Sequence, residues 1–100
     1  MYLKIHKPQN IRPVVALCDS ELLGKKFDDG KRQLDIRENF YKGDKVNEEQ
    51  AINIIKIQSV EDASFNIVGK KSIDVAIKAG IITKEGAAKI RNIPFALVLL

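Results

Sequence analysis

The sequence predicts a single small α+β domain in which a mixed, mostly antiparallel sheet packs against two main helices. Short segments that alternate as strands do dominate the first half, and two segments with helix caps lie in the second half. Residues 93–100 provide the third observation. This run is apolar on both faces of an extended chain, so it needs cover on both sides. We therefore expect the C-terminal strand to be central in the sheet.

Length and composition favour one domain that spans residues 1–100. Hydrophobic residues make up 45% and charged residues 30%, as is typical of a folded globular chain. The longest apolar runs are far shorter than the roughly 20 residues that a membrane span requires, and the first residues lack the apolar core of a secretory signal. One cysteine cannot form an internal disulfide, so we expect a cytoplasmic protein without membrane contact.

The first two strands are predicted from alternation and from turn residues. Tyr2–His6 alternates between apolar and polar residues, which is typical of a strand with one wet face. Residues 7–10 have turn chemistry, and residues 12–18 form the next apolar run. The two strands are therefore expected to pair antiparallel, with the second one inside the sheet.

The connection that follows contains one further strand. Asp19 is expected to cap a single helical turn that ends at Gly24. Residues 25–30 indicate a loop with an Asp-Gly turn. Residues 33–37 alternate again and are predicted as the third strand, and residues 39–46 as a long connection.

Asn47 begins the clearest helix of the chain. It is followed three positions later by Gln50, which is the spacing of a capping box. The apolar residues beyond this cap share one side of the helix and are Ala51, Ile52, Ile54 and Ile55. This stripe is expected to pack against the sheet.

The remaining elements complete the order β-β-β-α-β-α-α-β. Ser64–Val68 is predicted as a strand, and residues 72–79 as a helix closed by Gly80. Thr83 is expected to cap a short third helical turn. Pro94 then ends any helical tendency and opens the last strand.

The start of the second main helix is the candidate anion site. Gly69, Lys70, Lys71 and Ser72 follow a strand and lead into a helix, where backbone amides and the helix dipole favour phosphate. A Walker loop would need a glycine five residues before Gly69, and Ser64 is there instead. A nucleotide-hydrolysing site is therefore rejected. A looser contact with an anion or an RNA phosphate remains, beside the alternative of a plain helix entry with exposed lysines.

The last third of the chain carries most of the basic excess. The candidate cationic residues are Lys70, Lys71, Lys78, Lys84, Lys89 and Arg91. Lys71 and Lys78 are seven positions apart, so they share one helical face. The segment has no exposed aromatic platform for bases, so an RNA contact would be to backbone shape. The alternative is an ordinary solvated lysine surface.

The single histidine and the single cysteine do not suggest a metal site. His6 and Cys18 lie on strands predicted to be neighbours, so a Cys–His nucleophile pair is conceivable. Cys18 falls within an apolar run, however, where a thiol is usually inert packing. The sequence therefore assigns no catalytic residue, no metal and no cofactor.

Several segments together resemble a small archaeal family known as domain of unknown function 424. These segments are residues 1–6, 15–19, 22–27, 66–69, 75–80 and 93–94. The resemblance implies a cytosolic, single-domain archaeal protein without an established reaction, with genes that often lie among translation genes. Family members commonly have a histidine where this chain has Phe95. This chain therefore has no histidine at that position that could act in catalysis, which favours a binding or structural role for the segment.

These observations predict a non-catalytic binding protein that contacts RNA or the ribosome through its basic C-terminal third. One alternative is a protein–protein adaptor or homodimer that uses a sheet edge or the loop at Phe40 and Tyr41. The other alternative is an enzyme of small phosphorylated metabolites with its anion site at residues 69–72.

Overall fold

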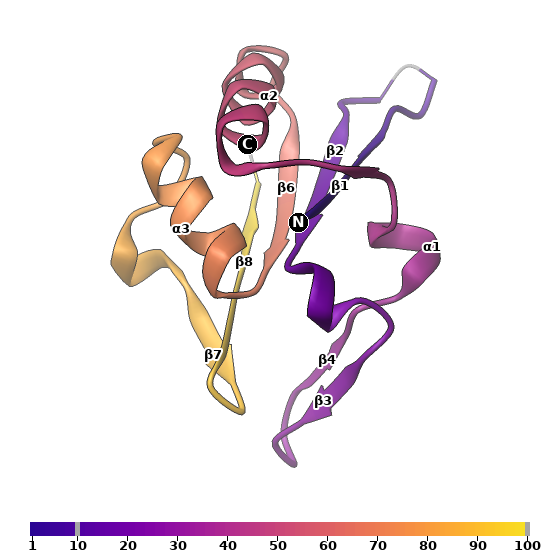
Figure 1. The fold of residues 1–100 in the computed structure, drawn as a ribbon, viewed down its shortest axis with the longest axis vertical. Coiled ribbons are helices and arrows are strands. Elements are labelled where there is room, and N and C mark those ends of the chain that lie inside the picture. Colours follow the sequence, from indigo (N-terminus) through magenta and orange to yellow (C-terminus); the bar gives the residue numbers. More distant parts are fainter. Residues whose placement is uncertain (10, 100) are drawn as a thin grey trace.

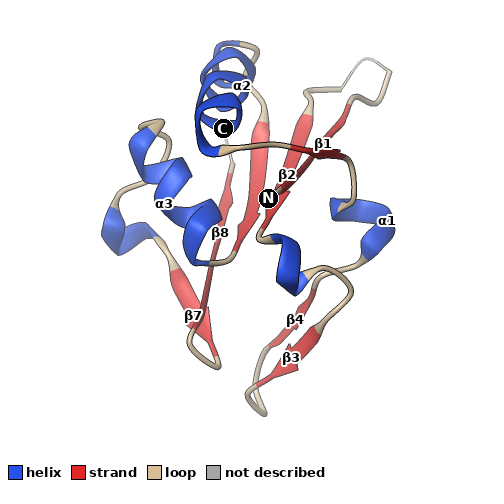
Figure 2. Ribbon diagram, viewed as in Figure 1, coloured by secondary structure: helices blue, strands red, loops and turns tan. Residues whose placement is uncertain are grey.

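The computed structural model of the chain describes residues 1–9 and 11–99. Asn10 and Leu100, which the sequence assigns to a turn and to the last strand, lie outside the described residues. The predicted α+β class is confirmed. A six-stranded sheet with the order β5-β1-β2-β6-β8-β7 is accompanied by the two-stranded hairpin β3-β4 (Figures 1 and 2).

The elements are short apart from two helices. The strands are β1 (Tyr2–His6), β2 (Val14–Cys18), β3 (Lys26–Asp28), β4 (Gln33–Asp35), β5 (Asp44–Lys45), β6 (Ser64–Val68), β7 (Ala88–Ile90) and β8 (Ile93–Val98). The α-helices are α1 (Glu38–Tyr41), α2 (Glu48–Val60) and α3 (Lys70–Lys78). Two 3-10 turns, η1 (Ser20–Leu22) and η2 (Lys84–Gly86), complete the fold.

The sheet is mixed, and its parallel pair lies in the middle. β1 returns antiparallel into β2, as predicted, and β2 runs parallel to β6 from the pair Val14 and Ser64 to the pair Cys18 and Val68. The pairs β1-β5, β6-β8 and β7-β8 are antiparallel. The carboxyl ends of β2 and β6 therefore meet at one edge of the sheet.

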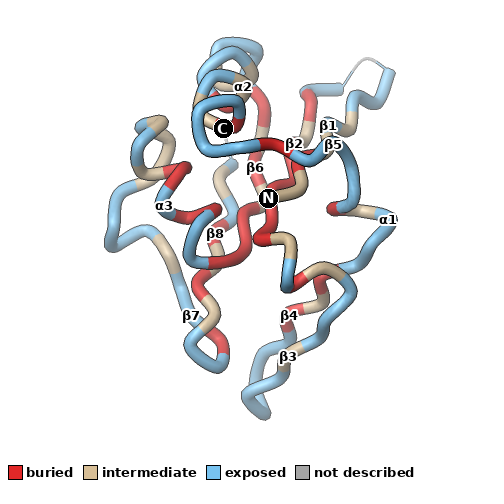
Figure 3. Tube along the Cα trace, viewed as in Figure 1, coloured by how far each residue is buried: buried red, intermediate tan, exposed pale blue. Residues whose placement is uncertain are grey.

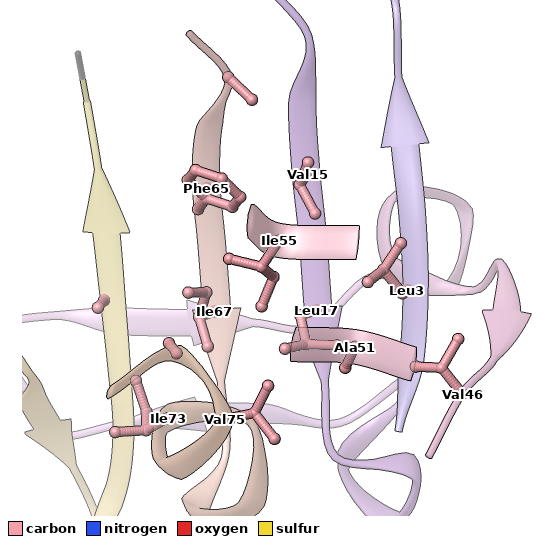
Figure 4. Close-up of a cluster of buried hydrophobic side chains, with 13 residues drawn as sticks. Leu3, Val15, Leu17, Val46, Ala51, Ile55, Phe65, Ile67, Ile73 and Val75 are labelled. Carbon is pink, nitrogen blue, oxygen red and sulfur yellow. The ribbon is translucent and has the colours of Figure 1, made fainter. Parts of the chain in front are cut away.

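The helices α2 and α3 cover one face of the sheet (Figure 1). The predicted capping box of α2 is confirmed: the Gln50 amide donates to Asn47 Oδ1 at 2.8 Å, and the Asn47 amide donates to Gln50 Oε1 at 2.9 Å. Beneath the helices lies the main hydrophobic core, seen in Figure 4. Its members include Leu3, Val15, Leu17, Ile55, Phe65, Ile67 and Ile73.

The segment 19–46 lies over the opposite face of the sheet. A second core forms there between this segment and the strands, with Leu34, Ile36 and Tyr41 among its members. The ring of His6 stacks on Phe40 with centroids 4.6 Å apart, and its Nε2 donates to the Phe40 carbonyl at 2.8 Å. These contacts attach α1 to β1, so the Phe40–Tyr41 loop is an internal contact and not an open surface.

The C-terminal strand was predicted to be central, and it does lie inside the sheet, as the fifth of its six strands, between β6 and the short edge strand β7. Its cover on both faces is incomplete, however. Leu97 is 59% exposed and Leu99 is 71% exposed. Both side chains lie on the face opposite α2 and α3. Segment 19–46 covers this face only in part, and it leaves these two side chains exposed. The expectation that this run is buried on both faces is therefore wrong for Leu97 and Leu99.

Four short elements were not predicted, namely β3, α1, β5 and β7. Each has two to four residues, which is too short for a periodic pattern to appear. β3 exists because Phe27 pairs with Leu34 of β4, within a segment that the sequence indicates as a loop. The predicted strand over residues 12–18 begins at Val14, and the helix predicted over residues 72–79 begins at Lys70.

We predict that shortening Ile55 to alanine destabilises the fold far more than the same change at Ile57. Ile55 is fully buried beneath α2, whereas Ile57 on the same helix is 62% exposed. The loss of buried volume should lower the free energy of unfolding by about 2 to 5 kcal/mol for Ile55→Ala. Urea unfolding followed by circular dichroism measures both variants. Equal losses for the two would contradict the described packing of α2.

Candidate functional site

The predicted anion site lies at the start of α3, directly after β6. The carboxylate of Asp19, which follows β2, lies against it. Asp19 Oδ1 accepts hydrogen bonds from the Ser72 amide and the Ser72 hydroxyl, both at 2.8 Å. Asp19 Oδ2 accepts from the Lys71 amide at 3.2 Å. A side chain of the protein itself therefore occupies the position that a phosphate would take at this helix end.

Asp19 and Ser72 are also the buried polar residues of the described chain, at 5% and 0% exposure. The sequence predicts that Asp19 caps its own turn, but its side chain makes no capping hydrogen bond to η1. It caps α3 instead, because the parallel pairing of β2 and β6 brings their carboxyl ends together. That part of the prediction is wrong, and a contact across 53 positions of sequence is the reason.

Gly69 is required by the same contact. A Cβ atom at this position would lie 2.3 Å from Asp19 Cγ, and the backbone φ of 110° is one that residues with side chains rarely adopt. The glycine therefore lets the Asp19 carboxylate approach the helix. It is not evidence for an external phosphate.

Acidic residues offset the positive charge on the face of α3 that carries Lys71 and Lys78. Lys78 forms ion pairs with Glu48 of α2 and, at 3.1 Å, with Asp74. The hydrogen bonds that Lys78 donates to the carboxylates of Glu48 and Asp74 raise the pKa of Lys78. Lys71 lines a hollow that also contains Glu48 and Asp74. Lys71 and Lys78 therefore lie among acidic groups, and Lys70 lines a second hollow together with Lys71 and Glu21.

Lys89 and Arg91 lie on the β7–β8 hairpin, which contacts the β3–β4 hairpin. Arg91 Nε donates to the Asp28 carbonyl at 2.7 Å, and Arg32 Nη2 donates to the Lys89 carbonyl at 2.9 Å. Figure 1 shows both hairpins projecting from the same end of the molecule, away from α2. We call residues 25–32 and 88–92 together the cationic hairpin surface.

The cationic hairpin surface carries the net charge of the whole chain. Its six basic residues are Lys25, Lys26, Lys31, Arg32, Lys89 and Arg91, and all are exposed. With two acidic residues, the surface has a formal charge of +4. The rest of the chain contains eleven basic and eleven acidic residues, so it sums to zero. Most of both hairpin tips is exposed in Figure 3.

The two acidic residues of this surface accept hydrogen bonds from backbone amides of the hairpin loop. Asp29 Oδ1 accepts from the amides of Lys31 at 3.0 Å and Arg32 at 2.7 Å, and Asp28 Oδ1 accepts from the Gly30 amide at 2.6 Å. The bonds from the Arg32 and Lys31 amides lower the pKa of Asp29. One oxygen of Asp29 also pairs with Arg32 at 3.6 Å. These carboxylates shape the hairpin loop, and they leave the lysines beside them facing water.

Sequence reasoning included Lys89 and Arg91 but missed the basic residues of the β3–β4 hairpin. It also missed the β7–β8 turn, where Arg91 and Asn92 have φ values of 50° and 64° between the paired residues Ile90 and Ile93. Two such residues form the type I′ turn of a two-residue hairpin. Asn92 was the available signal for this turn, because asparagine tolerates positive φ.

Phe95, where the resemblance places a histidine, lies on the same side of the sheet as this surface. The Arg32 guanidinium is 5.9 Å from the centre of the Phe95 ring, within the range of a cation–π contact. Phe95 therefore helps to hold the β3–β4 hairpin against β8. It has a packing role that an imidazole ring at this position would change.

His6 and Cys18 do not form a catalytic pair. Cys18 pairs with Tyr2, and His6 pairs with Val14, so the two lie at opposite ends of their strands, about 13 Å apart along the sheet. Burial first, and then repulsion by Asp19, raises the pKa of the Cys18 thiol to about 11. Such a thiol is protonated at neutral pH and is a poor nucleophile.

Potential metal ligands are scattered over the described residues. Within residues 1–9 and 11–99, no group of three His, Cys, Asp or Glu side chains is placed to hold a metal ion. No helix in this part of the chain combines the length and the apolar character needed to cross a bilayer.

The fold and this surface define a small α+β domain whose net positive charge is concentrated at one end of its sheet. Comparison with known proteins adds the family. The chain belongs to the family described as "Protein of unknown function (DUF424)", whose model matches residues 6–100. No curated protein matches the sequence.

A solved structure resembles the chain over nearly its full length. It is the crystal structure of an uncharacterized conserved protein from Methanopyrus kandleri, with a TM-score of 0.84 and 28% sequence identity. The similarity covers 97% of this chain and 88% of the other. The fold described above is therefore shared with this archaeal protein.

We predict that Asp19→Ala destabilises the fold while Glu21→Ala does not. Removal of the carboxylate leaves the amides of α3 without their partner in a buried place, so the free energy of unfolding should fall by about 2 to 3 kcal/mol. Glu21 is an exposed carboxylate two residues away and serves as the matched control. Urea unfolding measures both variants. A loss for Asp19→Ala no larger than that for Glu21→Ala would contradict the capping role.

A second prediction concerns alkaline pH. The thiol pKa of Cys18 rises from 9.0 to about 11 on folding, so between these values the unfolded chain binds fewer protons than the folded one. The free energy of unfolding should therefore fall as pH increases from 9 to 11, by up to about 2.7 kcal/mol.

The variant Cys18→Ala isolates this contribution. It should lack the decrease that begins near pH 9. It should retain the decrease that begins near pH 10, because burial raises the pKa of Tyr41 from 10.0 to about 12. Urea unfolding at pH 7, 9 and 10.5 gives the comparison. Parallel pH profiles for the two proteins would contradict the prediction.

Proposed function

We propose that this protein is a non-catalytic binding protein of the cytoplasm that contacts the phosphate backbone of RNA through its cationic hairpin surface. The observation that carries the proposal is the charge distribution: six exposed basic residues at one end account for the whole net charge of +4. A concentrated positive field attracts a polyanion, whereas the same residues spread over the molecule would serve solubility alone.

The local geometry supports contact with phosphates. Lys26, Lys31 and Lys89 are exposed, and no ion pair to them is found among the described residues. Lysine binds phosphate as a mobile point charge, and bound lysines release counterions from the nucleic acid. The guanidinium groups of Arg32 and Arg91 use one or two donors within the protein and retain others. The surface therefore offers several independent phosphate contacts.

The surface also indicates how RNA would be recognised. The described hairpin tips carry no aromatic side chain at residues 28–32 or 89–92, so bases have no stacking platform there. Contacts from such a surface are to the backbone and carry little sequence information. RNA, free or in the ribosome, is the partner that we expect, and DNA of the same length is the comparison that tests this choice.

The two alternative functions have weaker support. An enzyme of phosphorylated metabolites would use residues 69–72, but the amides of Lys71 and Ser72 already bond Asp19, and the Ser72 hydroxyl is fully buried. An adaptor that adds a strand to the sheet would use β5 or β7, which have two and three residues. Short charged edge strands resist such pairing.

We predict that the variant with both Lys31→Gln and Lys89→Gln binds single-stranded RNA with a weaker salt dependence. Each lost phosphate contact should reduce the slope of log affinity against log salt by about 0.7, so the double variant should lose about 1.4. Fluorescence anisotropy with a labelled RNA 12-mer between 50 and 300 mM salt gives the slopes, with a DNA 12-mer in parallel.

The matched control changes Lys42 and Lys56 to glutamine. Both lysines are exposed and lie outside the cationic hairpin surface, so net charge falls equally while the surface remains. The control should keep the wild-type slope. The proposal fails if RNA does not bind at 50 mM salt, if affinity is indifferent to salt, or if both double variants lose the same slope. Preference for DNA would remove RNA as the partner.

A further inference from the structure

A polar hollow lies on the face of the sheet opposite α2 and α3. It has a volume of about 330 Å³ and is lined by Asp35, Arg37, Asn39, Phe40, Tyr41 and Asn66. The lining comes from three separate segments: the end of β4 with the chain beyond it, α1, and the central strand β6. Its volume is at the lower end of the range of small-ligand sites, which combine an apolar or aromatic lining, here Phe40 and Tyr41, with a few polar groups.

Three residues that line this hollow carry a polar side-chain group that makes no hydrogen bond within the described chain. These groups are the amides of Asn39 and Asn66 and the hydroxyl of Tyr41. Asn66 is the informative member, because it occupies a half-buried position on β6 between the buried Phe65 and Ile67. A packed strand in this place favours an apolar residue. A carboxamide there offers one donor group and one acceptor to whatever enters.

The hollow adds no net charge. Asp35 and Arg37 pair with each other at 3.0 Å, so their charges cancel. Beside Asn66 on the neighbouring strand lies Leu97, its Cα partner in the pairing of β6 and β8, and the Leu97 side chain is 59% exposed on the same face. The site therefore combines neutral donors and acceptors with an apolar neighbour. This chemistry suits a flat, uncharged ring with hydrogen-bonding edges.

The hollow is connected to the cationic hairpin surface by a single strand. From Lys31 and Arg32 at the hairpin tip the chain continues into β4, whose last residue, Asp35, lines the hollow. The four residue steps of extended chain from Lys31 to Asp35 span about 13 Å. A polynucleotide with phosphates on the hairpin tip can therefore reach the hollow with one of its bases.

We propose that this hollow binds one unpaired nucleobase of the RNA whose backbone the cationic hairpin surface holds. The inference rests on the proposed function and adds a second site to it. The amides of Asn39 and Asn66 and the Tyr41 hydroxyl hydrogen-bond the edge of the base, and Leu97 contacts its face. The interaction is with an edge and not a stacking platform, so it distinguishes unpaired RNA from duplex RNA.

The test compares oligomers that differ only in their bases. A uridine 12-mer, an adenosine 12-mer and an abasic ribose-phosphate 12-mer are titrated at one salt concentration by fluorescence anisotropy. Wild-type protein should bind at least one base-bearing oligomer about tenfold more tightly than the abasic one. The variant Asn66→Ala should lose most of this difference and keep its affinity for the abasic oligomer. Asn53→Ala, an exposed asparagine of α2, is the matched control and should behave as wild type.

The outcomes separate this inference from the proposed function. If wild-type protein binds all three oligomers equally, the hollow does not bind a base, while the cationic hairpin surface still holds RNA. If no oligomer binds, both proposals fail. Should Asn66→Ala not fold, wild-type protein decides by NMR: the side-chain amide signals of Asn39 and Asn66 must shift with a base-bearing oligomer and not with the abasic one. Unchanged signals with every oligomer overturn the inference.

Discussion

The contact between Asp19 and the start of α3 is the interaction on which the arrangement of this protein depends. The chain leaves β2 and β6 at the same edge of the sheet but in different directions, because segment 19–46 crosses one face and α3 covers the other. At this branching point the Asp19 carboxylate accepts three hydrogen bonds from Lys71 and Ser72. Bonds of this kind, to a charged acceptor in a buried place, are the strong ones in proteins. The contact joins the two layers that cover the sheet.

The same contact explains why a helix entry that resembles an anion site need not be one. A glycine after a strand and before a helix can provide an approach for phosphate, but here it provides an approach for an internal carboxylate. The helix dipole and the free amides are satisfied equally well by either anion. The net positive charge of this protein lies elsewhere, on two hairpins whose own carboxylates accept hydrogen bonds from their loop amides.

Local sequence was sufficient for the elements that carry their own signal. The alternation in Tyr2–His6, the box formed by Asn47 and Gln50, and the strand Ser64–Val68 are all present as expected. Elements of two to four residues were missed because pairing, and not propensity, forms them. For the candidate site, Lys89 and Arg91 were identified, whereas Lys31 and Arg32 were not. The two hairpins of this surface are far apart in the sequence, and the hydrogen bonds between them join residues that are 57 and 63 positions apart. A count of charges along the chain therefore places their basic residues in different thirds.

The sequence by itself determined the α+β class, the two main helices, the interior place of the last strand and the resemblance to the family. Helix caps, turns and hydrophobic periodicity each involve only a few neighbouring residues, so they can be recognised from a single sequence. Only the tertiary structure decided which carboxylate caps α3, which basic residues share a surface, and that Asn39, Tyr41 and Asn66 line one hollow. These arrangements depend on the parallel pairing of β2 with β6 and on the path of segment 19–46. Such contacts are made through space between distant residues, and no local pattern encodes them.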